Sequence, residues 1–124
     1  MHRHDHTQRL FLNSSEVMKE LADRSVALTV TSPPYWNAID YGTHANDQHG
    51  TRWYRERMEG GSYDDWLGLM RRVFSEVFRA TRPGGVCAVV IGTLLHEGRH
   101  YPCPHDLVQV MHLIGWRFAD EIIW

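Results

Sequence analysis

The sequence lacks the features that mark membrane, secreted and disulfide-rich proteins. It contains no run of about 18 apolar residues that could span a membrane, and its polar start, Met1 to His6, is not followed by the apolar stretch of a signal peptide. Its two cysteines, Cys87 and Cys103, are too few for a disulfide framework. We therefore expect a soluble, cytoplasmic protein with no membrane partner.

An excess of charge is also lacking. The chain has 13 basic and 15 acidic residues and a formal net charge of -2, so any contact with nucleic acid must come from a local cluster. Histidines gather at positions 2, 4 and 6 and, together with Cys103, between positions 96 and 105. The first group could chelate a metal but is more typical of a flexible tail, and the second lacks the ligand spacing of a standard zinc site, so we predict no bound metal.

A chain of 124 residues with 43% hydrophobic content can bury one core of ordinary size. We expect a flexible tail over residues 1–8 and one domain, or part of one, over residues 9–124. Two nearly unbroken apolar segments predict strands that are covered on both faces: Val26–Thr31 and Val86–Ile91.

Amphipathic spacing and capping residues predict three helices. In chain order they run from Asn13, which caps the first, to about Asp23, from Ser62 up to Pro83-Gly84-Gly85, and from Pro104 to Ile114. The residues from Trp116 onwards begin as a further strand. Strands that alternate with helices predict a mostly parallel sheet in a three-layer α/β arrangement.

Residues 37–61 show no helical or strand period, and a loop of this length inside a domain is usually functional or mobile; we expect it to be both. Arg52 and Arg55 stand beside Trp53 and Tyr54 in this loop and suit contact with DNA. An ordinary solvated loop, with arginines paired to neighbouring glutamates, explains the same residues equally well.

The most unusual chemistry follows the first strand, in the run from Thr31 to Trp36. Prolines fix the backbone and lack N–H groups, so the carbonyls of Ser32 and Pro33 can be held as acceptors for an amino group. The Ser32 hydroxyl adds a third acceptor, while Tyr35 and Trp36 offer flat faces on which an extruded base could stack.

The tetrapeptide Ser32-Pro33-Pro34-Tyr35 resembles the catalytic motif of the N4-cytosine and N6-adenine DNA methyltransferases, whose first position is Asp, Asn or Ser. The serine form is similar to the N4-cytosine branch. The likeness in order and spacing extends over most of the chain: 14–35, 62–79, 81–85 and 115–124. It implies a Rossmann-like three-layer α/β/α sandwich of the S-adenosylmethionine-dependent methyltransferase type, incomplete at its C-terminus.

The resemblance implies transfer of a methyl group from S-adenosylmethionine to the exocyclic amine of a base flipped out of double-stranded DNA, in a bacterial restriction-modification system or an orphan relative. Ser32 and the Pro33 carbonyl would orient the amine, and Tyr35 would stack on the base. Asn13 and Ser32 would lie beside the cofactor. Two alternatives stay open: methylation of adenine N6, and a non-catalytic DNA-binding remnant or subunit that needs a second chain.

The glycine-rich cofactor loop of that family, Phe-x-Gly-x-Gly, is lacking, because no Gly-x-Gly occurs in the sequence. The family's permuted order places this loop and the target-recognition region after the catalytic motif. We therefore expect the main cofactor site to lie outside this chain and the chain by itself to be inactive. We also expect its last strand, left without a neighbour, to promote self-association.

Overall fold

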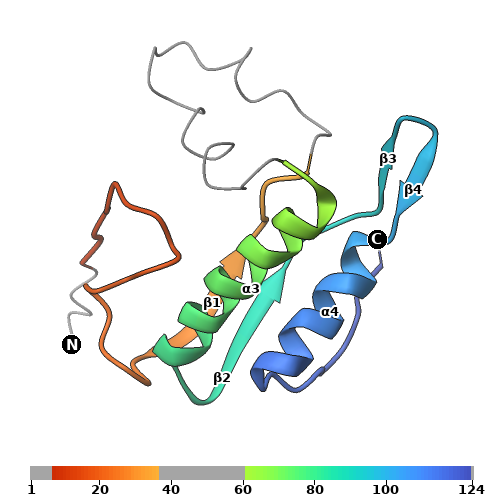
Figure 1. Ribbon diagram of the computed structural model, residues 1–124. Coiled ribbons are helices and arrows are strands. Elements are labelled where there is room, and N and C mark those ends of the chain that lie inside the picture. The colour runs from red at the N-terminus through yellow and green to blue at the C-terminus, as the bar shows by residue number, and fades with distance from the viewer. Residues whose placement is uncertain (1–6, 37–60, 124) are drawn as a thin grey trace.

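The computed structural model describes residues 7–36 and 61–123 (Figure 1). Within these ranges the elements follow in the order β1 (Val26–Thr31), α3 (Tyr63–Ala80), β2 (Thr81–Val89), β3 (Leu94–His96), β4 (Arg99–Tyr101) and α4 (Cys103–Ile114). Both long helices and both long strands were predicted from the sequence, with ends that differ by a few residues.

Strands β1 and β2 pair in parallel, which confirms the predicted parallel sheet. Thr29 is aligned with Cys87 and Thr31 with Val89, and the Val90 N–H extends the pairing by donating to the Thr31 carbonyl at 2.9 Å. The carboxyl ends of the two strands therefore meet at one edge of the sheet, which is where open parallel sheets usually bind their ligands.

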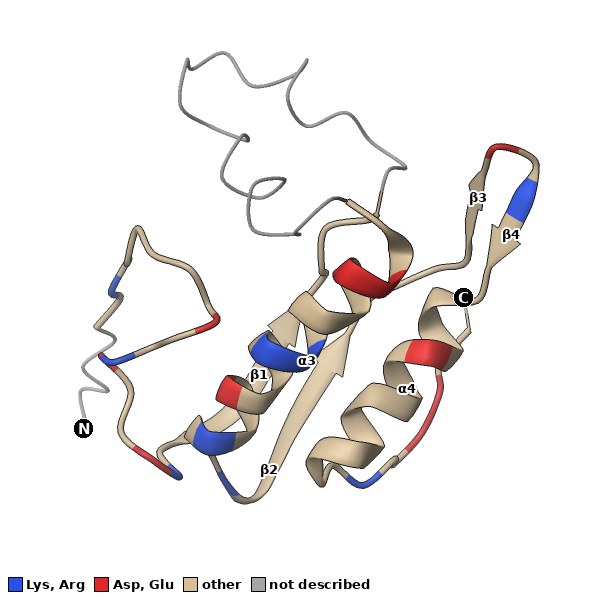
Figure 2. Ribbon diagram, viewed as in Figure 1, with Lys and Arg blue, Asp and Glu red and all other residues tan. Residues whose placement is uncertain are grey.

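The core lies on one face of this sheet, between the strands and the two helices. Helix α3 begins at the predicted cap, Ser62, whose hydroxyl accepts from the Asp65 N–H at 3.1 Å while Asp65 bonds back to Ser62. Figure 2 marks in red the acidic residues of its first turn, Asp64 and Asp65, which favour a helix N-terminus. Its apolar stripe packs against α4 and β2 and supplies most of the buried residues: Trp66, Leu69, Met70, Phe74 and Val77.

The opposite face of the sheet is apolar and exposed. Leu28 and Val30 of β1 are 58% and 68% exposed, and Val86 of β2 is 54% exposed. The prediction that both faces are covered is therefore wrong for the described residues. The strands have the sequence pattern of buried ones because their outward side chains are as apolar as their inward ones.

The helix predicted from Asn13 to Asp23 is absent, and turns take its place. Asn13 accepts from the adjacent Ser14 N–H at 2.8 Å and caps no helix. The backbone groups of this segment are bound by side chains of α3: the Met18 N–H donates to Glu76 at 2.8 Å, and Arg79 donates to the carbonyl oxygen atoms of Met18 and Leu21 at 3.0 Å. These long-range bonds replace the helical ones.

Glu76 joins this segment to α3, and its ionisation should make stability depend on pH. The pKa of Glu76 is lowered to about 2, mainly because Arg79 donates hydrogen bonds to its carboxylate and also because the Met18 N–H does. A carboxyl whose pKa falls on folding stabilises the fold above its unfolded pKa, near 4.5. That contribution is lost as the pH falls towards 2.

We therefore expect Glu76→Gln to lower the free energy of unfolding by about 1 kcal/mol at neutral pH, a value kept small by partial exposure to water. The difference from the wild-type chain should shrink below pH 4.5 and vanish below pH 2. Urea midpoints measured across this range test the prediction, with the exposed Glu20→Gln in the same segment as control. A difference in urea midpoint between wild type and variant that stays the same at low pH would contradict the prediction.

Helix α3 ends at Ala80, before the glycine pair predicted to terminate it. The pair lies inside β2, where the register shifts between the Val26–Thr81 and Leu28–Val86 pairings. Gly84 has a φ of 77°, and a Cβ on Gly85 would lie 2.9 Å from the Arg82 carbonyl oxygen. The two glycines thus allow the irregular start of β2, and their assignment as a helix terminator was wrong.

Two further segments differ from prediction. The stretch expected as a polar loop before α4 contains the antiparallel hairpin β3–β4. The residues after Gly115 were expected to begin a strand, but residues 116–123 form none, since no described strand pairs with them. Trp116 is held instead by α3, where its ring meets Phe78 edge-on with centroids 5.3 Å apart.

Candidate functional site

The segment from Ser32 to Trp36 leaves the sheet at the shared carboxyl edge of β1 and β2. Ser32 is the first residue after β1 and is exposed, whereas Pro33 is buried. The peptide before Ser32 is fixed by the bond from the Val90 N–H to the Thr31 carbonyl. An exposed hydroxyl thus stands directly beside a fixed strand end.

Two indole N–H groups hold the rest of this segment in place. Trp66, which is fully buried in α3, donates from Nε1 to the Pro34 carbonyl at 2.8 Å. Trp36 donates from Nε1 to the Gly61 carbonyl at 2.7 Å. The described residues supply a donor for the Pro34 carbonyl and none for the carbonyls of Ser32 and Pro33. The latter two are the acceptors that the sequence singled out.

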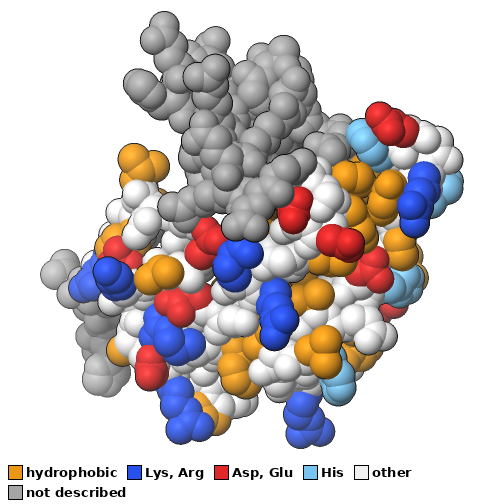
Figure 3. All heavy atoms as spheres, in the orientation of Figure 1, with side chains coloured by type: hydrophobic (Ala, Val, Ile, Leu, Met, Phe, Trp, Pro, Cys, Tyr) orange, Lys and Arg blue, Asp and Glu red, His pale blue; other side chains and the backbone are white. Residues whose placement is uncertain are grey.

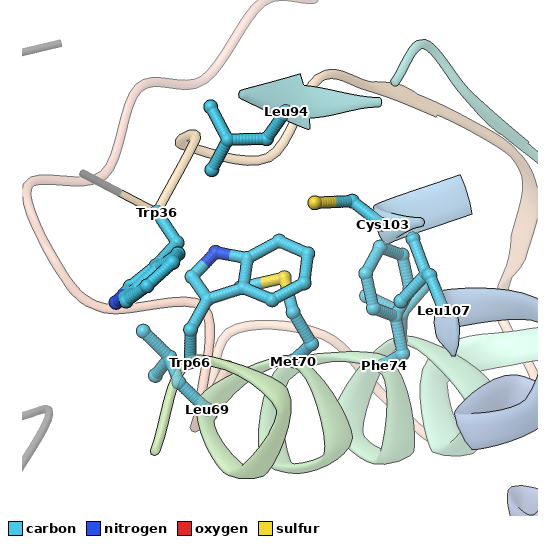
Figure 4. Packing of buried hydrophobic residues seen from close by; sticks show 9 residues of the cluster. Trp36, Trp66, Leu69, Met70, Phe74, Leu94, Cys103 and Leu107 are labelled. Carbon is cyan, nitrogen blue, oxygen red and sulfur yellow. The ribbon is translucent and has the colours of Figure 1, made fainter. Parts of the chain in front are cut away.

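Trp36 itself lies in the core and is 6% exposed (Figure 4). Its ring meets those of His96 and Tyr101 edge-on, with centroids 5.0 Å and 4.8 Å apart, and the Tyr63 ring lies at 5.4 Å. Its faces are thus covered by protein, contrary to the expectation that they are open to a base. Trp36 instead anchors the C-terminal end of the segment.

Tyr35 keeps an intermediate exposure at the same edge. A Cβ on Gly92, three residues beyond the end of β2, would lie 3.9 Å from the Tyr35 hydroxyl oxygen. The structure therefore brings Tyr35, three residues after Ser32, close to the segment that follows β2. A planar ring next to fixed acceptors suits a flat ligand that carries an amino group.

Tyr63 supports this arrangement from the first turn of α3. Its hydroxyl donates to Asp106 of α4 at 2.8 Å, and its ring stacks on Trp66 with centroids 5.7 Å apart. Burial raises the pKa of Tyr63 well above its ordinary value, and the bond to Asp106 raises it further. The phenol therefore stays protonated and joins α3 to α4 beside the candidate site.

The remaining predicted site residues are not gathered here. Asn13 lies in the N-terminal segment, where its side chain bonds the next residue, and its contact with a cofactor stays a prediction. Arg52 and Arg55 lie outside the described residues. Over residues 7–36 and 61–123, no three His, Cys, Asp or Glu side chains form a group that could hold a metal. No described helix is both long and apolar enough to cross a membrane.

The sequence contains no Gly-x-Gly turn for the methionine-binding part of a cofactor site. Such a site needs a glycine-rich turn between a strand and a helix, so that the backbone can approach the ligand closely. The described glycines with positive φ are Gly61, Gly84, Gly98 and Gly115; Gly61 precedes α3 on the connection from β1, and the other three lie in β2, in the β3–β4 turn and at the end of α4.

Sequence reasoning missed the two indole hydrogen bonds and the hairpin that packs against Trp36. The indole bonds join residues 25 and 32 positions apart, and no local pattern indicates such contacts. The hairpin did leave a signal. Glu97 and Gly98 join two three-residue strands and have φ values of 48° and 73°, as a tight two-residue turn requires.

Residues 26–124 match the family model described as DNA methylase. The chain is 33% identical to the type II methyltransferase M.MthZI of Methanothermobacter thermautotrophicus over 95% of its own length and 35% of that protein's. It is 29% identical to the type II methyltransferase M.MwoI of Methanothermobacter wolfeii, covering 93% of this chain and 16% of the relative. The chain thus spans about a third or less of these relatives.

Solved structures of a candidate DNA modification methylase from Thermus thermophilus share the fold. One has a TM-score of 0.59 at 30% identity and covers 86% of this chain and 37% of that one. Another, in complex with S-adenosyl-L-methionine, has a TM-score of 0.56 at 31% identity, with 82% and 38% covered. These likenesses confirm the predicted α/β fold of the methyltransferase type, of which the described residues form a part.

Proposed function

The chain belongs to the DNA methylase family, and from that membership we propose that residues 32–35 orient the exocyclic amine of a DNA base for methylation, with cytosine N4 as the preferred target. The observation that carries the proposal is the bond from Trp66 Nε1 to the Pro34 carbonyl. It holds the segment at the carboxyl edge while the carbonyls of Ser32 and Pro33 receive no donor from the described residues.

The proposed chemistry needs only hydrogen bonding and orientation from these residues. The Ser32 hydroxyl and the Pro33 carbonyl accept the two amine N–H groups, which raises electron density on the nitrogen and directs its lone pair. Tyr35 stacks on the base and fixes its plane. No strong general base is required, because the nitrogen would become acidic as the methyl group leaves the donor's sulfur, and its proton would then pass to water.

S-adenosylmethionine is the methyl donor used by this family, and it would supply an activated methyl group. We propose that its main binding loop is provided by residues outside this sequence, because the sequence has no Gly-x-Gly. The exposed apolar face of β1 and β2 supports the same proposal, since further chain or a second copy could cover it. The duplex DNA partner is proposed from the family alone.

A chimera tests the proposed function. This chain replaces the aligned third of M.MthZI, and the product is incubated with duplex DNA and isotope-labelled S-adenosylmethionine. We expect labelled DNA, with N4-methylcytosine identified by mass spectrometry of the digested nucleosides. Intact M.MthZI serves as positive control.

The products of this reaction separate the alternatives. N6-methyladenine would replace the cytosine assignment by the adenine one. A folded chimera that binds DNA but transfers no methyl group would contradict the enzymatic proposal and favour a DNA-binding subunit.

A further inference from the structure

The hairpin β3–β4 lies near the carboxyl edge of the sheet, and the proposed function assigns it no role. It follows β2 through Gly92, beside the Tyr35 hydroxyl. Figure 1 shows the hairpin projecting beyond the ends of β1 and β2. A ligand that reaches Ser32 and Tyr35 from solvent therefore approaches the hairpin as well.

The inner face of the hairpin fixes it to the candidate site. Leu94 is 5% exposed, and the rings of His96 and Tyr101 pack edge-on against Trp36. Trp36 in turn ends the segment that begins at Ser32. The position of the hairpin is thus tied to that of the proposed base-binding residues.

The outer face is open to solvent and carries mixed chemistry. Leu95 is 59% exposed and stands directly across from His100, which is exposed too. Arg99 alternates onto the face of the hairpin that carries Tyr101, but it is itself exposed near the turn. Its guanidinium lies 5.0 Å from the Tyr101 ring centroid, a cation–π contact that pre-orients it. Figure 3 shows basic, histidine and apolar side chains side by side in this region.

Charge on the hairpin is divided between its strands and its tip. Arg99 lies on β4 and the acidic residue, Glu97, lies at the turn (Figure 2). The Glu97 carboxylate is 3.9 Å from His96 Nε2. His100 can donate a hydrogen bond in either protonation state. The β4 side therefore offers donors suited to phosphate oxygens, next to an apolar side chain suited to a sugar or base edge.

We propose that hairpin β3–β4 is a DNA-contacting ribbon, with Arg99 and His100 binding the backbone of the duplex beside the target base and Leu95 directed into the groove. The inference rests on the proposed function, which requires duplex DNA at this edge. A two-stranded ribbon has dimensions that the major groove of DNA admits. Contacts of this kind position a protein on DNA without reading its sequence.

The test uses the whole chain and a short fluorescein-labelled duplex, with binding followed by fluorescence anisotropy across a potassium chloride series. One lost phosphate contact should lower the slope of log affinity against log salt by about 0.9. We expect Arg99→Ala to weaken binding at low salt and to reduce the slope by this amount. Leu95→Ser should weaken binding without changing the slope.

Arg117→Ala is the matched control. It removes the same charge from an exposed position next to Trp116, which packs on Phe78 near the other end of α3. It should leave affinity and slope unchanged. Circular dichroism of each variant verifies that it is folded.

Equal effects of Arg99→Ala and Arg117→Ala, or no duplex binding by the wild-type chain, would overturn the inference. This failure is separable from that of the proposed function. A methylating chimera that is indifferent to Arg99→Ala would overturn the ribbon alone. If only Arg99→Ala and Leu95→Ser weaken DNA binding but the chimera never methylates DNA, the proposed methyl transfer alone would be overturned.

Discussion

Trp66→Ala should leave most of the chain unfolded at room temperature. Trp66 is fully buried, and removal of a buried tryptophan side chain costs about 3–5 kcal/mol. Complete small domains have only about 5–15 kcal/mol of stability, and this chain leaves one face of its sheet exposed. The substitution also removes the donor to the Pro34 carbonyl. Circular dichroism during urea titration would measure the loss.

Trp66→Phe separates the packing of this side chain from its hydrogen bond. Phenylalanine keeps an aromatic ring in the core but cannot donate to Pro34, so we expect a folded variant destabilised by about 1–2 kcal/mol. Its Tyr35 and Trp36 amides should exchange with solvent faster than those of the wild type. Equal stability of the alanine and phenylalanine variants, or unchanged exchange at Tyr35, would contradict the anchoring role.

Ser32→Ala should have the largest effect on methyl transfer by the chimera with M.MthZI. The substitution removes one of the two proposed acceptors for the amine but leaves the prolines in place. Loss of one pre-oriented hydrogen-bonding group in an active site lowers kcat by about a hundredfold or more. Because Ser32 is exposed, stability should change by less than about 0.5 kcal/mol. Initial rates at saturating DNA would measure the effect.

Ser32→Asn is the informative partner of this variant. Asparagine keeps an acceptor at the same position and is one of the residues found there in the resembling family. We expect it to retain more activity than alanine, and any change in base preference would show in the ratio of the two methylated nucleosides. An alanine variant as active as the wild type would show that Ser32 does not orient the amine.

The corrected position of Trp36 changes how the site is understood. The aromatic pair after the prolines was expected to form one stacking surface, but only Tyr35 keeps partial exposure. Trp36 uses its indole N–H and its ring to join the segment to Gly61 and to the hairpin. Tyr35 therefore stays accessible while Trp36 is part of the core, and the sequence, which shows only two adjacent aromatic residues, does not distinguish these roles.

The sequence by itself determined the elements whose signals are local. The apolar run of β1, the Ser62 cap and apolar stripe of α3, and the spacing in α4 all predicted the observed elements. The Ser-Pro-Pro-Tyr motif and its context predicted the family that the comparisons show. Each of these signals spans only a few neighbouring residues, so it can be recognised without knowing the tertiary structure.

The tertiary structure decided what depends on partners far along the chain. The N-terminal segment has a capping pattern for a helix, yet Glu76 and Arg79 bind its backbone from 58 to 61 positions away. The indole of Trp66 reaches Pro34 across 32 positions, and the hairpin covers Trp36. A local preference of a few tenths of a kcal/mol per residue yields to such contacts, because a hydrogen bond to a charged side chain contributes about 1.5–3 kcal/mol.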